Sequence, residues 1–234
     1  MDILYEDRQI AVIVKPAGMS SQKTPDGRDA VTELEKHTDA EIFPVHRLDT
    51  QTRGVMVYAK TRQAASFLSR EITEGHFIKE YDALIHGCPA EPSGVMEDLL
   101  FKDSSKNKSY VVKKERKGVK KASLEYILTK TEETKKGVLS LVRIRLHTGR
   151  THQIRVQFAS RKLPVFGDGK YGANDNAPFL GLSSRSVSFR HPQTGENMTF
   201  TYDADFFHKL PDQYLSIEST ESTNTVAPPT VTSL

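Results

Sequence analysis

Short apolar runs rich in β-branched residues alternate with turn signals along most of the chain. These runs predict strands over residues 9–14, 54–59, 79–86, 122–130, 137–146, 184–189 and 197–202. A polar turn separates 122–130 from 137–146, and His191–Gly195 between the last two runs predicts a hairpin. Apolar residues at helical spacing predict helices over 29–39 and 61–74, and Gly75 stands where a C-terminal cap belongs.

The predicted strands follow one another more often than they alternate with helices. This order favours an α+β fold with a mixed, largely antiparallel sheet over a doubly wound parallel sheet. From Ser216 onward, nine of nineteen residues are Ser or Thr, and Pro228-Pro229 interrupts them. We therefore expect one domain over residues 1–212 and a disordered tail over residues 213–234.

The composition is that of a globular protein with no membrane or disulfide signature. The 234 residues carry 33 Lys and Arg against 30 Asp and Glu, a formal net charge of +3. The apolar runs are too short to cross a bilayer, Met1 begins no signal peptide, and one cysteine allows no internal disulfide. We expect a cytoplasmic protein, in which Cys88 at a strand end is a buried, unreactive thiol.

The charge is distributed unevenly along the chain. The net charge is +7 from Lys102 to Lys121 and +6 from Arg143 to Lys162, whereas the rest of residues 1–209 sums to −7. Concentrated basic segments in an otherwise acidic body are typical of a surface that binds a polyanion. The first segment alone fits a solvated lysine-rich loop equally well. In the second, arginines are spaced along an apparent strand and turn.

The common catalytic and cofactor motifs are missing from this chain. It has no phosphate-binding loop, dinucleotide-binding glycine motif, nucleophile elbow or His-Glu-x-x-His. Three segments remain whose side chains could take part in catalysis or binding. Residues 45–54 set Asp49 between two arginines, residues 147–155 are rich in hydrogen-bond donors, and residues 77–84 carry Tyr81. Taken singly, each segment also fits a purely structural role. Asp49 fits a structural salt bridge, residues 147–155 a solvated turn, and Tyr81 a core aromatic.

Taken together, the three segments resemble the RluA-type family of RNA pseudouridine synthases. The motifs that carry the resemblance are His46-Arg47-Leu48-Asp49 with Thr52 and Gly54, Lys79-x-Tyr81-x-Ala83, and Gly149-Arg150-Thr151-His152-Gln153-Ile154-Arg155. Further similar stretches are Lys15-Pro16-Ala17-Gly18, Gly167-Asp168 with Tyr171-Gly172, and His191-Pro192-x-Thr194-Gly195-Glu196. The resemblance extends from about Ile3 to Leu210 and implies the pseudouridine synthase fold, a sheet flanked by helices and loops.

The chain departs from the family pattern at three positions outside the presumed chemical residues. Arg53 stands where the family commonly has Ser, Val14 where it has Asn, and Gln157 where it has His. The pattern begins almost at Met1, so we expect no separate N-terminal RNA-binding domain.

The resemblance implies an enzyme that breaks the N1–C1′ bond of a uridine in RNA and rejoins the base through C5. Asp49 would be the catalytic carboxylate, acting either covalently or by removing a ribose proton, Arg155 its ion-pair partner, and Tyr81 a stacking platform. Arg47 would occupy the position that a flipped uridine leaves. The full set of expected RNA-binding residues is Arg47, Arg53, Arg143, Arg145, Arg150, His152, Lys113, Lys114, Lys117, Lys120 and Lys121.

We expect a monomer that binds rRNA or tRNA, with no metal, no organic cofactor, no DNA and no membrane partner. Two alternatives stay open on the residues alone. One is an RNA-binding or RNA-folding module without catalysis, which would not need the Asp49 carboxylate. The other is a nucleoside-hydrolysing glycosidase, which would need two carboxylates around the bond.

Overall fold

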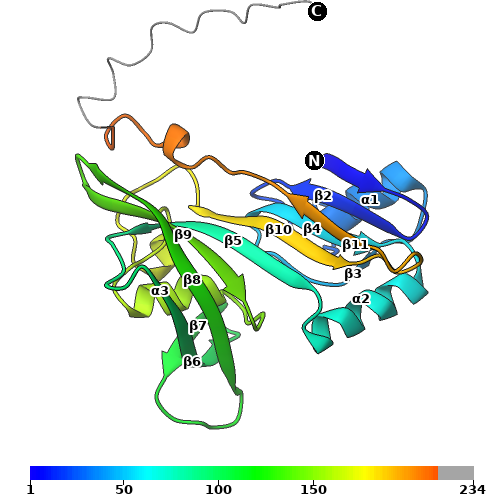
Figure 1. The fold of residues 1–234 in the computed structure, drawn as a ribbon, viewed down its shortest axis with the longest axis horizontal. Helices are drawn as coiled ribbons and strands as arrows, with labels where there is room; N and C mark the ends of the chain where they lie inside the picture. The colour runs from blue at the N-terminus through cyan, green and yellow to red at the C-terminus, as the bar shows by residue number, and fades with distance from the viewer. Residues whose placement is uncertain (216–234) are drawn as a thin grey trace, which may run out of the picture.

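The computed structural model describes residues 1–215; of the expected tail, residues 216–234 lie outside the described part. Within residues 1–215, eleven strands form one sheet in the order β1-β2-β4-β10-β5-β9-β8-β6-β7, with β3 paired to β4 and β11 to β10 (Figure 1). The strands of the N-terminal half are β1 Asp2–Glu6, β2 Ile10–Lys15, β3 Phe43–Pro44, β4 Arg53–Ala59, β5 Ile78–His86 and β6 Ser93–Asp103. The remaining strands are β7 Lys108–Val112, β8 Val119–Thr134, β9 Gly137–Leu146, β10 Leu182–Arg190 and β11 Asn197–Thr201.

The sheet is mixed and largely antiparallel, which confirms the predicted fold class. Both predicted hairpins form, β8 with β9 and β10 with β11. Among the described pairings only β4 and β10 run parallel, with Gly54 opposite Ser184. A Cβ on Gly54 would lie 2.1 Å from the Ser184 carbonyl oxygen, and its φ is +117°, so this position requires glycine.

Both predicted helices form, and Gly75 caps the second as predicted. Helix α1 (Ala30–Thr38) starts after Asp29, whose side chain accepts a hydrogen bond from Thr32 N–H. Helix α2 (Arg62–Glu74) starts after Thr61 and ends at Gly75, which has left-handed backbone. Two 3-10 turns, η1 Gly169–Tyr171 and η2 Phe207–Lys209, complete the regular structure of residues 1–215 together with the helix described next.

A third helix, α3 (Gln153–Ser160), occupies the segment predicted as strand and turn, so that prediction was wrong. Residues 153–158 are all buried, including two glutamines and an arginine. Because polar side chains lie inside on every face, the segment lacks the apolar stripe by which sequence analysis recognises a helix.

The helices cover opposite faces of the sheet. Leu34 of α1 and Phe158 of α3 pack in one cluster with Tyr81 of β5. On the other face Leu68 of α2 packs against Val57 of β4. Figure 1 shows that the β8, β6 and β7 end of the sheet turns away from the β1, β2 and β4 end, with α3 beside β6 and β7. The site described below lies on the face of α1 and α3, where these two parts of the sheet meet.

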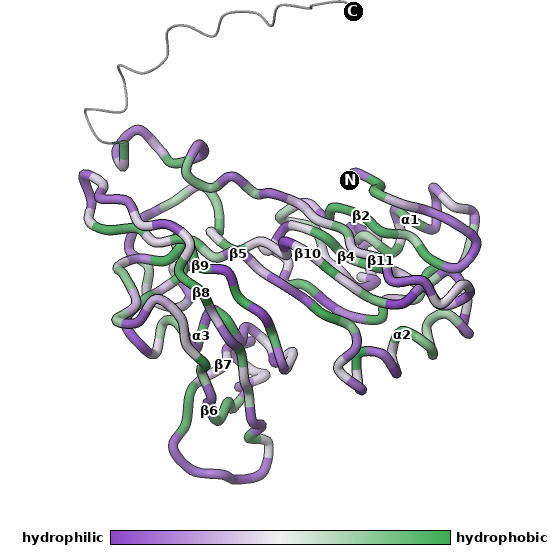
Figure 2. The backbone as a smooth tube through the Cα atoms, viewed as in Figure 1, coloured by the Kyte–Doolittle hydropathy of each residue, from purple (hydrophilic) through white to green (hydrophobic). Residues whose placement is uncertain are grey.

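The first basic segment contains the hairpin of β6 and β7 and the connection that leads from β7 to β8 on the other side of β6. It runs from the end of β6 through β7 and the connection 113–118 into the start of β8. All six residues of the connection are exposed, and Figure 2 shows it as a hydrophilic projection beyond the sheet. The prediction for Cys88 was wrong: its thiol is exposed, because the turn after β5 leads the chain to the surface. No helix within residues 1–215 is long and apolar enough to cross a membrane.

Candidate active site

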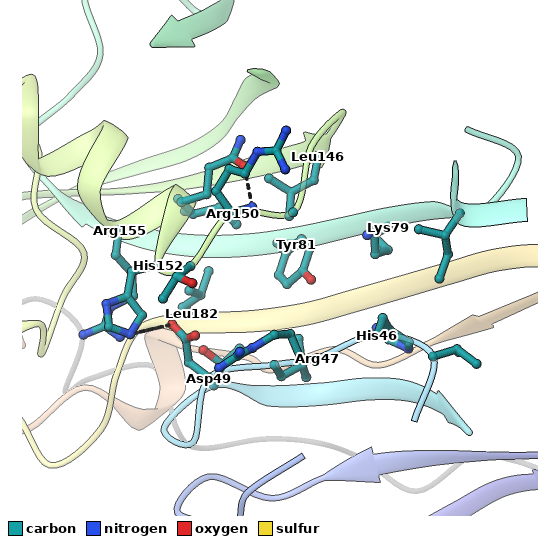
Figure 3. A pocket seen from close by; sticks show the side chains of 18 residues that line it. His46, Arg47, Asp49, Lys79, Tyr81, Leu146, Arg150, His152, Arg155 and Leu182 are labelled. Atoms are coloured by element: carbon teal, nitrogen blue, oxygen red, sulfur yellow. Dashed lines mark hydrogen bonds and ion pairs between the residues drawn. The ribbon is translucent and has the colours of Figure 1, made fainter. Parts of the chain in front are cut away.

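Two connecting segments and strand β5 form most of the walls of a cavity of about 280 Å³. Its walls come from the connection between β3 and β4, from β5, and from the turn that leads from β9 into α3. Asp49, Tyr81 and Arg155, which are far apart in the sequence, all line it (Figure 3). The cavity therefore brings together the three side chains expected to be catalytic.

Asp49 is held by an arginine that is itself anchored from behind. Arg155 Nη1 donates to Asp49 Oδ2 at 3.1 Å, while its Nε and Nη2 donate to the two oxygens of Asp168 at 2.6 and 2.8 Å. Although burial lowers the pKa of Arg155, the hydrogen bonds and charges of Asp168 and Asp49 outweigh it and raise that pKa. A permanently charged, rigid guanidinium therefore orients the Asp49 carboxylate.

His152 and Tyr171 extend this network. His152 has left-handed backbone with φ +54°, which turns the chain into α3. Its Nδ1 hydrogen-bonds the Tyr171 hydroxyl at 2.9 Å, and its Nε2 lies 3.8 Å from Asp49 Oδ2. Burial lowers the pKa of His152. The imidazole is therefore neutral near neutral pH and lies beside the Asp49 carboxylate as a hydrogen-bonding group.

Tyr81 forms the floor of the cavity. The side chain is 5% exposed and belongs to the core cluster shared by α1 and α3. Burial, and then the charge of Asp49, raise the pKa of Tyr81, so its hydroxyl stays protonated. A rigid aromatic ring with one polar end is suited to stacking on a planar base and donating a hydrogen bond.

Sequence reasoning assigned no role to three further residues at or beneath this cavity. Lys15 is fully buried, and its Nζ donates to the carbonyls of Pro16, Met19 and Thr50 at 2.8, 2.8 and 3.2 Å. It thus ties β2 to the residue that follows Asp49.

The other two, His46 and Lys79, line the cavity itself. Both stand inside motifs that the sequence displays, next to Arg47 and two residues before Tyr81. Their positions within these motifs could therefore have identified both as candidate site residues.

The expected RNA-binding arginines divide between the two faces of the sheet. Arg47, Arg150 and His152 line the cavity. Arg143 and Arg145 alternate with Val142 and Ile144, which are packed on the face of Tyr81, so both arginines lie on the opposite face. Strand periodicity already carried this signal, because the apolar and basic positions alternate in the sequence.

Their contacts, and those of Arg53, agree with this division. Arg143 Nε donates to the buried carboxylate of Asp82 at 3.2 Å, and Arg145 lies 3.6 Å from Glu125. The guanidinium of Arg53 lies over the Tyr202 ring, 5.1 Å from its centroid, and does not line the cavity. Arg143 therefore lies outside the cavity, and its expected part in RNA binding stays a prediction.

The five expected RNA-binding lysines of the first basic segment lie on the connection from β7 to β8 and at the start of β8, and all are exposed: Lys113, Lys114, Lys117, Lys120 and Lys121. The start of β8 touches the rim of the cavity, because Arg150 Nε donates to the Lys121 carbonyl at 2.9 Å. This contact connects the first basic segment to the second.

One group of potential metal ligands in the described chain lies elsewhere. Glu71, Glu74 and His76 at the end of α2 have ligand atoms within 4.8 Å of one another. The Glu71 carboxylate is already held at both oxygens by Arg190, at 2.6 and 2.9 Å. The group therefore offers little free ligand capacity and does not contribute to the cavity.

Residues 9–160 match the model of the RNA pseudouridylate synthase family. Among curated proteins, the chain is 34% identical over 220 residues to an RNA pseudouridine synthase of Aquifex aeolicus described as uncharacterized, covering 86% of this chain and 68% of that protein. It is 33% identical to the ribosomal large subunit pseudouridine synthase C of Buchnera aphidicola, covering 88% and 68%. The chain is 32% identical to the dual-specificity RNA pseudouridine synthase RluA of Escherichia coli, and the match covers 87% of this chain and 93% of that protein.

A solved structure has the same fold. Human RNA pseudouridylate synthase domain containing 1 superposes with a TM-score of 0.74, covering 94% of this chain and 92% of that one at 21% identity. The predicted family, fold and enzyme class are confirmed by these comparisons.

Proposed function

Because the chain belongs to the RNA pseudouridylate synthase family, as a member of the RluA type, and isomerises uridine in RNA to pseudouridine, we propose that Asp49 is its catalytic carboxylate. The observation that carries the proposal is the ion pair between Asp49 and Arg155 in a cavity floored by Tyr81. Among the residues that line this cavity, Asp49 is the one carboxylate.

In the proposed reaction, the N1–C1′ bond of the uridine breaks, the uracil turns, and a new bond joins C5 to C1′. Asp49 acts either as a nucleophile or as the base that removes a ribose proton, and both roles need an ionised, oriented carboxylate. Arg155 holds this carboxylate in place, and Asp168 holds Arg155. The C5 proton leaves to solvent when the new bond is complete.

Tyr81 stacks on the uracil while it turns. Its ring is buried and lines the cavity, and its hydroxyl stays protonated. Arg47 is exposed at the rim of the cavity and fills the position from which the uridine is flipped. Arg150, His152 and the five exposed lysines between Lys113 and Lys121 bind phosphates, which position the RNA without reading its sequence.

We propose structured rRNA or tRNA as the substrate, since two relatives are named for the large ribosomal subunit and for dual specificity. A cytoplasmic enzyme follows from that proposal. The catalytic domain in this proposal spans residues 1–212.

The hydrolytic alternative is disfavoured by the cavity. A glycosidase needs two carboxylates about 5–10 Å apart across the bond. Asp168 is the other carboxylate of the Asp49–Arg155 network, but it lies behind Arg155 and does not line the cavity. It is therefore not available as a second catalytic acid.

The decisive experiment measures tritium release from RNA labelled at uridine C5. The wild-type enzyme should release tritium and Asp49→Asn should not, although Asp49→Asn should still retain the RNA in filter binding. Asp203→Asn is a matched control, because this carboxylate is 78% exposed and lies outside the cavity. RNA binding by the wild type without release would identify a binding module, and free uracil would identify a hydrolase.

A further inference from the structure

Lys79 separates the site cavity from a second cavity. Lys79 lies on β5 two residues before Tyr81, so the two side chains project from the same face of the sheet. The second cavity, of about 510 Å³, shares Lys79, Leu146, Gly149 and Arg150 with the first and continues past the end of α2. We call it the Lys79 cavity. The shared residues place the two cavities side by side.

Lys79 is partly buried but has no recorded partner. Within residues 1–215, no hydrogen bond or ion pair joins its Nζ to another residue, whereas the buried Lys15 donates to three carbonyls. A Cβ built on Gly149 would lie 3.7 Å from Lys79 Nζ, so the ammonium lies beside the turn into α3. The side chain is partly buried, so its ammonium is partly withdrawn from water and has no protein carboxylate beside it. A cation in this position is available to an anionic ligand that enters the cavity.

His46, which lines the site cavity but not the Lys79 cavity, is a second donor without an acceptor. Its Nε2 accepts a hydrogen bond from Val57 N–H at 3.0 Å, so the proton of the neutral ring is on Nδ1. Nδ1 is buried and has no partner within the described chain. Figure 3 shows His46 and Lys79 together at one end of the site, with Asp49 and Arg155 at the other and Tyr81 between them.

The electrostatics around both groups favour an anion. The residues lining the Lys79 cavity include no Asp or Glu, but they include Arg145, His147 and Arg150. Glu125, outside this lining, lies 3.6 Å from Arg145 and 3.7 Å from His147 and offsets part of their charge. Burial lowers the pKa of Lys79, and burial together with the Lys79 charge lowers the pKa of His46 to about 3.

We propose that the Lys79 cavity binds a phosphodiester of the substrate RNA adjoining the target uridine, with Lys79 Nζ donating to a non-bridging oxygen. The inference rests on the proposed function, because it assumes that the uridine occupies the space between Tyr81 and Asp49. The bound phosphate supplies the acceptor that Lys79 lacks in the free protein. Lys79 thereby holds the backbone while the base is turned.

The test compares Lys79→Met with Lys79→Arg, using bulk rRNA and tRNA labelled at uridine C5 for both filter binding and tritium release. Lys79→Met should weaken RNA binding about tenfold, the effect of losing about 1.4 kcal/mol, and Lys79→Arg should restore it. The slope of log K against log salt should fall by about 0.7–0.9, the contribution of one phosphate contact. The melting temperature of Lys79→Met without RNA should be unchanged or higher, because an unpaired buried charge is removed.

Lys60→Met is the matched control. Lys60 is 11% exposed, but its Nζ is paired with Glu6 at 2.6 Å on another part of the sheet. This variant should lose stability and keep RNA binding.

Unchanged binding or an unchanged salt slope in Lys79→Met would overturn the proposal, as would a lowered melting temperature accompanied by full affinity. Failure of the proposed function is separately visible as a wild-type protein that forms no pseudouridine. A Lys79-dependent salt slope in such a protein would still support the phosphate site.

Discussion

Replacement of Asp168 by Asn tests whether the arginine behind Asp49 must be anchored. Asp168 has a side chain 1% exposed and accepts two hydrogen bonds from Arg155. In the Asn variant, one oxygen can still accept, but an NH₂ group faces a guanidinium N–H. Arg155 then has Asp49 as its one remaining carboxylate partner.

The expected loss of stability follows from these contacts. Removing one partner of a buried ion pair costs about 3–5 kcal/mol, and the retained hydrogen bond and the charge of Asp49 reduce this to about 2–3 kcal/mol. For a chain of this size that corresponds to about 5–10 °C in melting temperature. Turnover should fall about 100-fold, because a carboxylate misplaced by about 1 Å loses its reactive geometry.

The assay is tritium release under saturating RNA, together with thermal unfolding of the same preparations. RNA affinity should change little, because Asp168 does not line the cavity. Asp98→Asn is the control, since Asp98 accepts from Arg161 Nη1 at 2.8 Å at the other end of α3, outside the cavity. This control should lose some stability and keep its turnover.

A variant that is destabilised but turns over at the rate of Asp98→Asn would refute the reasoning. Asp168 would then stabilise the fold without positioning Arg155 for catalysis. Full stability of Asp168→Asn would equally contradict the energetic argument.

Three further predictions concern the backbone at Gly54, the buried Lys15, and the exposed lysines between β7 and β8. Gly54→Ala should lose about 3–5 kcal/mol or fail to fold, because its Cβ meets the Ser184 carbonyl at 2.1 Å, and a near-wild-type thermal melt would contradict this. Burial lowers the pKa of Lys15 to about 8, so between pH 8 and 10.5 the unfolded chain holds more protons than the native one. As the pH increases through that window, the free energy of unfolding of the wild type should therefore rise relative to that of Lys15→Met, by at most about 1.4 kcal/mol per pH unit. Urea titrations at several pH values measure this difference, and a difference that does not change with pH would argue against the prediction. Replacing Lys113 and Lys117 by Gln should lower the salt slope of RNA binding by about 0.7–0.9 per lost phosphate contact, and an unchanged slope would identify a solvated loop.

Much of the fold was predictable from local sequence. β-Branched runs indicated seven strands, and Gly75 marked the end of α2 through its backbone conformation. Strands β1, β3, β6 and β7 were not predicted: Glu97 and Asp98 interrupt the apolar pattern of β6, and the other three have five residues or fewer. Helix α3 escaped it because burial on all faces removes the periodicity on which the prediction depends.

The candidate site was predictable only in part, and the motifs rather than composition indicated Asp49, Tyr81 and Arg155. Residue types did not reveal that Asp168 would close a bidentate pair behind Arg155, or that Lys79 would lie partly buried with no partner within residues 1–215. Nor did the count of arginines separate Arg150, in the cavity, from Arg143, on the opposite face. Only the alternation of a strand makes that distinction.

The sequence by itself determined the elements, the family and the identity of the chemical groups, because each depends on neighbours along the chain or on a short motif. The tertiary structure decided which of those groups meet, since Asp49, Tyr81 and Arg155 lie on three separate segments joined by the order of the sheet. It also decided which charges are paired with another residue of the described chain. Burial and distance govern both, and neither is a property of a residue taken alone.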